Sequence, residues 1–180
     1  MKRLLTIIGL VASITLVVVL LWLFFDNYSH QSTANVPEYA ENSVGSMDNQ
    51  LADQIVDQVN QARQENGLSA LKRNDLLDKA AGQKAMDMLT RNYWSHNTPD
   101  GKLPFVFITK TGYDYVYAGE VLACDFQDVS GVVNGWLNSK IHREVILSSD
   151  YKDVGIAAIK GKLLGKQTTL IVMFTAAAHK

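Results

Sequence analysis

The sequence has only one cysteine, Cys124, among its 180 residues, so no disulfide can form within the chain. Its stability must come from a hydrophobic core, and the chain beyond the N-terminal apolar run is long enough to bury one. The sequence also has little net charge: the formal value is −1, and lysine and arginine form no basic block. Nucleic acid is therefore not an expected partner.

Motifs of the common hydrolases are absent as well. The chain contains no Gly-x-Ser-x-Gly or His-Glu-x-x-His segment, and no Ser-His-Asp order is recognisable. Cys124 could serve as a thiolate nucleophile, but a lone cysteine more often packs as a small apolar residue. These absences lower the expectation of an enzyme.

The longest apolar run, Leu4–Phe25, has no charged residue in 22 positions. As a helix rising about 1.5 Å per residue it would span roughly 33 Å, which is enough to cross a bilayer core. Lys2 and Arg3 precede the run and Asp26 follows it, a distribution that predicts a cytoplasmic N-terminus. We therefore predict that residues 1–25 form a cytoplasmic tip and a single-pass transmembrane signal anchor, with the domain on the extracytoplasmic side.

A cleaved signal peptide is the alternative for this N-terminal region. Its apolar core would normally be about 7–15 residues long and would end near a small-residue cleavage site. Residues 32–34 resemble such a site but lie well beyond the apolar run. Residues 26–46 are polar and show no apolar periodicity, so we predict a flexible spacer, followed by a domain over residues 47–180.

Three helices are predicted in the domain. Apolar residues recur at spacings of three and four in residues 47–66, 75–92 and 128–139, as in amphipathic helices. The expected N-caps are Ser46 or Asp48 for the first helix and Asn74 for the second.

A β-hairpin is predicted to end the chain. Residues 153–160 and 167–178 have the composition of strands, and the connection between them, residues 161–166, contains two glycines. Residues 93–127 show no regular pattern. Helices followed by a hairpin predict an α+β class, with helices packed on an antiparallel sheet.

Two histidines and a glutamate lie in segments that could build a functional site. His96 follows the second predicted helix and precedes a turn, where it could equally be a loop histidine bonded to backbone. Glu120 lies in an apolar stretch, where an unpaired carboxylate would be costly. His142 follows the third predicted helix beside Arg143, a position that also suits a surface ion-pair cluster. The remaining histidines, His30 and His179, are expected to have no specific role.

Several short segments match one family in order and spacing over about residues 53–174. They are Val59-Asn60-Gln61-Ala62-Arg63, Gly67-Leu68, the stretch Ser95–Gly101, Pro104-Phe105, Gly112-Tyr113, Gly119-Glu120, Trp136, Ser139, His142-Arg143 and Ile146-Leu147. The sequence thereby resembles the bacterial branch of the CAP superfamily, named for cysteine-rich secretory proteins, antigen 5 and pathogenesis-related class 1 proteins. The resemblance implies a three-layer α-β-α sandwich and a surface cleft to which His96, Glu120 and His142 map.

The chain departs from this family pattern at four places. Val121 and Val145 stand where the branch usually has asparagine, Ile141 stands in place of the glycine of Gly-His-Arg, and Leu170-Ile171-Val172 replaces a common Trp-Thr-Gln. Replacing two partners of one polar network by apolar residues can be nearly neutral, whereas replacing only one strands the other. We therefore predict that Val121 and Val145 lie close together.

The three site residues allow more than one chemistry. His96 and His142 could bind a divalent ion such as zinc, although no cofactor is required. Without a metal, Glu120 could hold an imidazole in one tautomer while the histidine transfers protons. The resemblance favours binding of an envelope or extracellular ligand, such as a lipid, a peptide or a cell-wall component. The alternatives are a hydrolase acting on an envelope substrate and a degenerate site on an interaction platform.

Four further residues are expected to have structural roles. Arg143 should order its loop by ion pairing, and Trp136 should anchor the third helix in the core. Tyr113 and Asp100 should shape the loops in which they lie.

Overall fold

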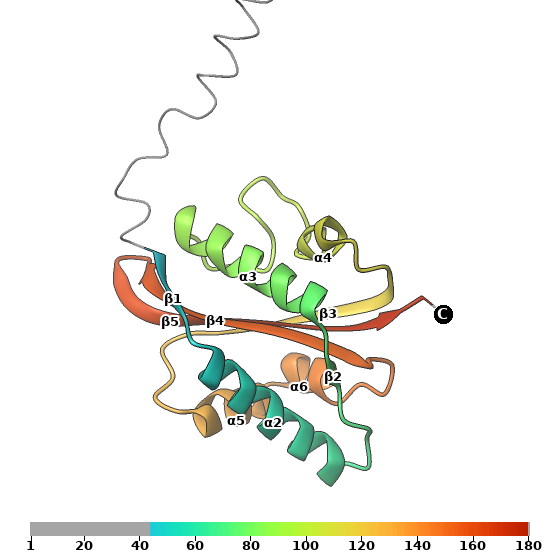
Figure 1. Ribbon diagram of the computed structural model, residues 1–180. Coiled ribbons are helices and arrows are strands. Elements are labelled where there is room, and N and C mark those ends of the chain that lie inside the picture. Colours follow the sequence, from blue (N-terminus) through green and yellow to red (C-terminus); the bar gives the residue numbers. More distant parts are fainter. Residues whose placement is uncertain (1–43, 180) are drawn as a thin grey trace, which may run out of the picture. The chain divides into compact units, whose positions relative to one another are not determined.

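The computed structural model describes residues 44–179 (Figure 1). The predicted membrane anchor and most of the predicted spacer lie outside these residues. Within the described part of the chain, every helix is too short or too polar to cross a bilayer.

A five-stranded sheet forms the middle of the fold. Its centre is the predicted hairpin, in which β4 (Asp153–Leu163) pairs antiparallel with β5 (Lys166–Ala178). β1 (Val44–Met47) pairs with β4, and β3 (Tyr115–Ala123) pairs with β5, both antiparallel. The short β2 (Lys72–Arg73) runs parallel to β4. The order β1-β4-β5-β3 makes β3 an edge strand.

Helices cover both faces of this sheet (Figure 1). One layer contains α3 (Asp75–Thr90) and α4 (Val106–Thr111). The opposite layer contains α2 (Asn49–Glu65), α5 (Val129–Asn138) and α6 (Lys140–Ile146). The fold is thus a mixed α+β structure with helices on an antiparallel sheet, as the sequence predicts.

The two hydrophobic clusters explain the apolar run in β5. Val172 and Phe174 belong to the cluster under α3 and α4, whereas Ile171 and Met173 belong to the cluster under α2 and α5. Successive side chains of a strand point to opposite faces, so a strand buried on both faces needs apolar residues at every position.

The three predicted helices are confirmed, with shorter ends. Asp48 caps α2 by accepting a hydrogen bond from the Leu51 amide at 3.0 Å, and Asn74 caps α3 in the same way. Met47 belongs to β1, so Val44–Ser46, which the sequence analysis places in the spacer, pair with the sheet in the described structure. A four-residue strand is too short to show a periodic pattern, and its pairing depends on β4.

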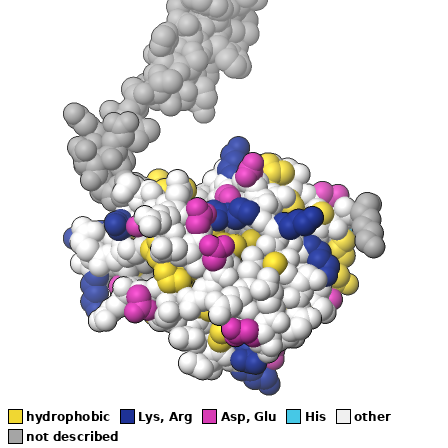
Figure 2. All heavy atoms as spheres, turned by 60° about the horizontal axis from the view of Figure 1, so that its bottom comes forward, with side chains coloured by type: hydrophobic (Ala, Val, Ile, Leu, Met, Phe, Trp, Pro, Cys, Tyr) yellow, Lys and Arg dark blue, Asp and Glu magenta, His cyan; other side chains and the backbone are white. Residues whose placement is uncertain are grey.

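The segment predicted to be irregular, residues 93–127, contains both α4 and β3. Residues 115–118 of β3 are exposed or half-buried while residues 119–123 are buried, so no single period runs through the strand. The β4–β5 connection is shorter than predicted, because Leu163 pairs with Lys166 and only Leu164 and Gly165 form the turn. On the face shown in Figure 2, Lys and Arg side chains are interspersed with Asp and Glu side chains.

Candidate functional site

The candidate site lies at the β3 edge of the sheet, where a buried carboxylate holds a surface imidazole. Glu120 is in β3, and its side chain is 2% exposed. His96 is in the loop after α3, and its side chain is 52% exposed. His96 Nδ1 lies 2.6 Å from Glu120 Oε1, which is a short hydrogen bond. Because this contact uses Nδ1, the other ring nitrogen, Nε2, is left to meet solvent or a ligand.

Burial controls the charge of Glu120. Desolvation raises the pKa of this carboxyl, while the hydrogen bond to His96 and the charges of Lys84 and His96 act in the opposite direction. Its second oxygen, Oε2, is buried and has no hydrogen-bond partner among the described residues. Glu120 therefore takes up a proton more readily than an exposed glutamate does.

Replacing Glu120 by glutamine should change how stability depends on pH. A raised folded-state pKa means that the contribution of Glu120 to stability is complete below its unfolded pKa, about 4.3, and is lost as pH rises through the folded pKa. Glutamine carries no charge, so the Tm of Glu120→Gln relative to the wild type should increase between pH 4 and pH 8. Thermal unfolding across this range measures the difference. Glu144→Gln, at an exposed glutamate of α6, is the control, and a Tm difference that stays constant or falls would contradict the expectation.

His142 lies in α6 and completes the predicted trio. Burial lowers its pKa, and the charge of His96 lowers it further. Only His96 and Glu120 are joined directly, since no hydrogen bond links His142 to either of them in the described structure.

Binding of a metal ion by His96 and His142 stays a prediction. No three His, Cys, Asp or Glu side chains within residues 44–179 converge on a position that could hold an ion. Glu120 Oε1 is already engaged by His96 Nδ1. Zinc sites in proteins normally have at least three protein ligands, so no step proposed below uses a metal. A broad groove along α3, lined in part by Met47, Met86 and Phe107, contains none of the three candidate residues.

Lys84 of α3 fixes the loop that carries His96, although it is not among the residues predicted from the sequence. The residue is fully buried. Its Nζ donates hydrogen bonds to the carbonyl oxygens of Ser95 at 2.9 Å and His96 at 2.7 Å, and to the Tyr93 hydroxyl at 3.1 Å. Burial lowers its pKa, while the charges of Glu120 and Asp87 raise it. The available signal was its position, because Lys84 falls within the apolar stripe of the helix.

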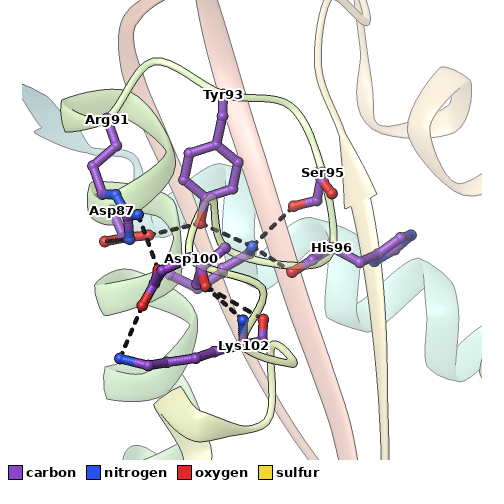
Figure 3. Close-up of polar contacts among 9 residues, drawn as sticks. Asp87, Arg91, Tyr93, Ser95, His96, Asp100 and Lys102 are labelled. Atoms are coloured by element: carbon purple, nitrogen blue, oxygen red, sulfur yellow. Dashed lines mark hydrogen bonds and ion pairs between the residues drawn. The ribbon is translucent and has the colours of Figure 1, made fainter.

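A second group of polar contacts closes the same loop (Figure 3). Asp100 pairs with Arg91 at 2.9 Å and with Lys102 at 2.9 Å, and these contacts together with Thr98 hold the pKa of Asp100 well below its usual range. Figure 3 shows the imidazole of His96 pointing away from this network. Asp100 thus shapes the loop, as predicted, and the ring of His96 remains available.

Two other structural predictions are confirmed. Trp136 is 2% exposed, and its Nε1 donates a hydrogen bond to the Leu122 carbonyl at 2.9 Å, which anchors α5 to β3. Tyr113 donates a hydrogen bond to Asp153 Oδ2 at 2.6 Å and so ties the loop before β3 to the start of β4.

The prediction for Arg143 was wrong. Arg143 is exposed, and no ion pair involving it is found among the described residues. The loop after α6 is ordered instead by the buried Arg63 of α2. Its Nη1 donates hydrogen bonds to the carbonyl oxygens of Ile146 at 2.6 Å and Ser148 at 2.9 Å. Arg63 lies more than eighty residues before these two carbonyl groups in the chain, so the sequence does not reveal that it reaches them.

Val121 lies in the hydrophobic cluster under α2 and α5, and Val145 packs against that cluster. A direct contact between the two valines stays a prediction. Val145 packs beside Gly119, where a Cβ would lie 2.8 Å from Val145 Cγ1 and 3.0 Å from Thr175 Oγ1. The Thr175 hydroxyl is buried and has no hydrogen-bond partner in the described chain. The Tyr151 hydroxyl would lie 2.9 Å from the same Cβ, so polar groups as well as Val145 border Gly119.

Cys124 is half-buried and lacks the surroundings of a reactive thiol. Burial raises the pKa of its thiol, and the neighbouring Asp125 raises it further. Both effects disfavour the thiolate, which is the reactive form.

Comparisons with known proteins agree with this architecture. A sequence model of the cysteine-rich secretory protein family, CAP, matches residues 56–175. The protein YkwD of Bacillus subtilis is 33% identical over 106 residues, which are 59% of this chain and 41% of that protein. The membrane protein YlbC of the same organism is 33% identical over 103 residues, 57% of this chain and 30% of that protein. The chain thus spans less than half the length of these two relatives.

Two solved structures show the same fold. An outer surface protein of Borrelia burgdorferi has a TM-score of 0.67 at 22% identity and covers 75% of this chain and 99% of its own. An extracellular protein of Bacillus anthracis that contains an SCP domain has a TM-score of 0.59 at 24% identity, over 69% of this chain and 39% of its own.

Proposed function

The chain belongs to the cysteine-rich secretory protein family, CAP, and we propose that it is a membrane-tethered protein that binds an envelope or extracellular ligand at His96, Glu120 and His142. The observation that carries this proposal is the hydrogen bond between the buried Glu120 and the half-exposed His96. Related proteins described as a membrane protein and an outer surface protein support the proposed location.

The geometry suits recognition of a ligand with a polar group. Glu120 fixes the ring of His96 in one orientation, and Lys84 fixes the backbone that carries the ring. The imidazole of His96 therefore already has a fixed orientation when a ligand binds to Nε2. Less conformational entropy is lost on binding as a result. Ile141, next to His142, is 72% exposed and offers an apolar contact beside the polar ones. A lipid or a peptide, with both kinds of surface, fits this combination.

Binding can be tested with the full-length chain purified in detergent and three probes. The probes are phosphatidylglycerol vesicles, isolated peptidoglycan sacculi and an immobilised random peptide pool. For whichever probe the wild type retains, His96→Ala and His142→Ala should each weaken binding about tenfold or more, which is about 1.4 kcal/mol. His179→Ala, at an exposed histidine paired only loosely with Asp114 at 3.7 Å, should have no effect. Equal binding by the wild type and both site variants would refute the proposal.

One observation favours hydrolysis as a second function. A carboxylate that orients an imidazole is the arrangement used for general-base catalysis, and a water molecule could be the nucleophile. Incubation of the full-length chain with envelope extract, followed by mass spectrometry, would reveal released products. Product formation by the wild type but not by the double variant His96→Ala, Glu120→Ala would establish catalysis at this site. Equal product formation by both would exclude it.

A further inference from the structure

Three turns meet at one end of the sheet, which we call the hairpin end. They are the turn after α3 at Asn92, the loop after β3 at Asp125, and the β4–β5 turn at Leu164. Each contains a non-glycine residue with a positive φ, of 53°, 64° and 48° respectively. The Leu164 amide donates a hydrogen bond to Asn92 Oδ1 at 2.7 Å, and the Asp125 amide donates one to Thr168 Oγ1 at 3.2 Å. The three turns are therefore connected parts of one surface.

Leu164 is the unexpected residue on this surface. Asparagine and aspartate adopt the left-handed region readily, but leucine rarely does, and tight hairpin turns favour Asn, Asp or Gly. The side chain of Leu164 is nevertheless 60% exposed at the tip of the turn. Neither local backbone preference nor core packing accounts for an exposed leucine here. A backbone outlier of this kind points to a role outside folding.

Other exposed side chains give the hairpin end the character of a lipid-binding surface. Trp94 lines one pocket together with Leu164 and is 42% exposed. Lys162 and Lys166 flank the turn on opposite faces of the hairpin, and both are exposed. Within residues 44–179, neither lysine has a carboxylate within 4.0 Å, whereas Lys160 is paired with Asp48 at 3.5 Å. Tryptophan is enriched at membrane interfaces, and lysine is attracted to anionic head groups.

The N-terminal segment also joins the domain at this end. Val44, the first described residue, is in register with Gly161 of β4, three residues before Leu164. In Figure 1, β1 lies at the same end of the sheet as the β4–β5 turn. As a random coil, residues 26–43 of the predicted spacer would have a root-mean-square reach of roughly 23 Å. A domain tethered through this spacer would keep its hairpin end close to the bilayer.

We propose that the hairpin end rests on the head groups of an anionic membrane, with Leu164 and Trp94 at the interface and Lys162 and Lys166 reaching lipid phosphates. This inference rests on the membrane tether of the proposed function. It also extends that function, because Trp94 and His96 lie on the same loop. Contact through Trp94 holds the binding site at the lipid surface, where a ligand of the envelope would be met.

Tryptophan quenching by brominated lipids tests the proposal. The full-length Trp22→Phe variant retains Trp94 and the buried Trp136, so lipid contact can quench only Trp94. In vesicles that contain phosphatidylglycerol and dibrominated phosphatidylcholine, we expect loss of about a third of the emission. Adding Leu164→Asn, or Lys162→Gln with Lys166→Gln, should at least halve this quenching, and so should high salt. Asparagine suits the left-handed turn, so the Leu164 variant should remain folded.

The controls separate this inference from the tether. Leu103→Asn, at a leucine that is 59% exposed outside the hairpin end, should leave quenching unchanged. Flotation of the chain with neutral phosphatidylcholine vesicles depends only on the predicted membrane anchor. If the chain does not float with these vesicles, the tether is refuted. A chain that floats but shows no quenching overturns the hairpin contact and leaves the tether in place. Self-association that Leu164→Asn abolishes, in the absence of quenching, would assign the surface to a second copy and overturn the lipid proposal.

Discussion

Gly155→Ala is expected to prevent stable folding, because α3 crosses β4 directly over this glycine. A Cβ at position 155 would lie 2.1 Å from the backbone carbon of Leu77 and 2.3 Å from the Asp78 amide nitrogen. The same crossing is held by the Ile156 amide, which donates a hydrogen bond to Asp78 Oδ1 at 2.8 Å. No side-chain rotation can relieve a clash with helix backbone, so α3 would have to move away from the sheet. We expect a loss of ~3 kcal/mol or more in the free energy of unfolding.

Thermal unfolding of Gly155→Ala measures this effect, and Gly161→Ala is a matched control on the same strand. The expected loss lowers Tm by roughly 10 °C or more. At position 161 the nearest atom to a new Cβ is the Leu89 Cδ1 at 2.9 Å, the end of a flexible side chain. Its substitution should therefore cost less than ~1.5 kcal/mol. A Gly155→Ala protein that unfolds within a few degrees of the wild type would show that α3 does not require this contact.

The parts of the fold that could be predicted from sequence are those encoded by local periodicity. In α2, α3 and α5 apolar residues recur on one face of the helix. In the β4–β5 hairpin a connection with two glycines separates two segments of strand composition. β3 and β1 could not be predicted, because their strand character depends on pairing with β5 and β4 rather than on their own pattern. Gly155 shows the same limit, since nothing near it in the sequence reveals that a helix passes over it.

The need of Glu120 for a partner was predictable from the sequence, whereas the residues that support this pair were not. A carboxylate in an apolar stretch required a partner, and the structure supplies His96 as that partner for Glu120. Lys84 and Arg63 escaped prediction because each acts through backbone carbonyl groups, which leave no trace in a sequence. Both are long side chains on buried faces of helices. A lysine or arginine inside the apolar stripe of a helix therefore indicates a buried charge, and a buried charge needs specific hydrogen-bond acceptors.

The support from Lys84 leads to the second large effect, which we expect from Lys84→Met. The substitution preserves much of the apolar stem but removes the donor that serves the Ser95 and His96 carbonyl oxygens. Buried acceptors without partners cost about 1–3 kcal/mol each, so we expect stability to fall by ~2 kcal/mol or more. Removing this charge also removes an influence that lowers the pKa of Glu120, so that carboxyl should become still easier to protonate. His96 should lose its fixed orientation as a result.

Hydrogen exchange of the amides in residues 93–98 distinguishes positioning of this loop from a general loss of stability. In Lys84→Met these amides should exchange at least tenfold faster under conditions in which the core strands remain protected. Binding of the retained probe should weaken in parallel, because the imidazole is no longer held in place. Lys79→Met, at an exposed lysine of the same helix, should change neither measurement. If the loop amides of Lys84→Met exchange at the wild-type rate, Lys84 does not position His96, and the order of the site must come from the Asp100 contacts alone.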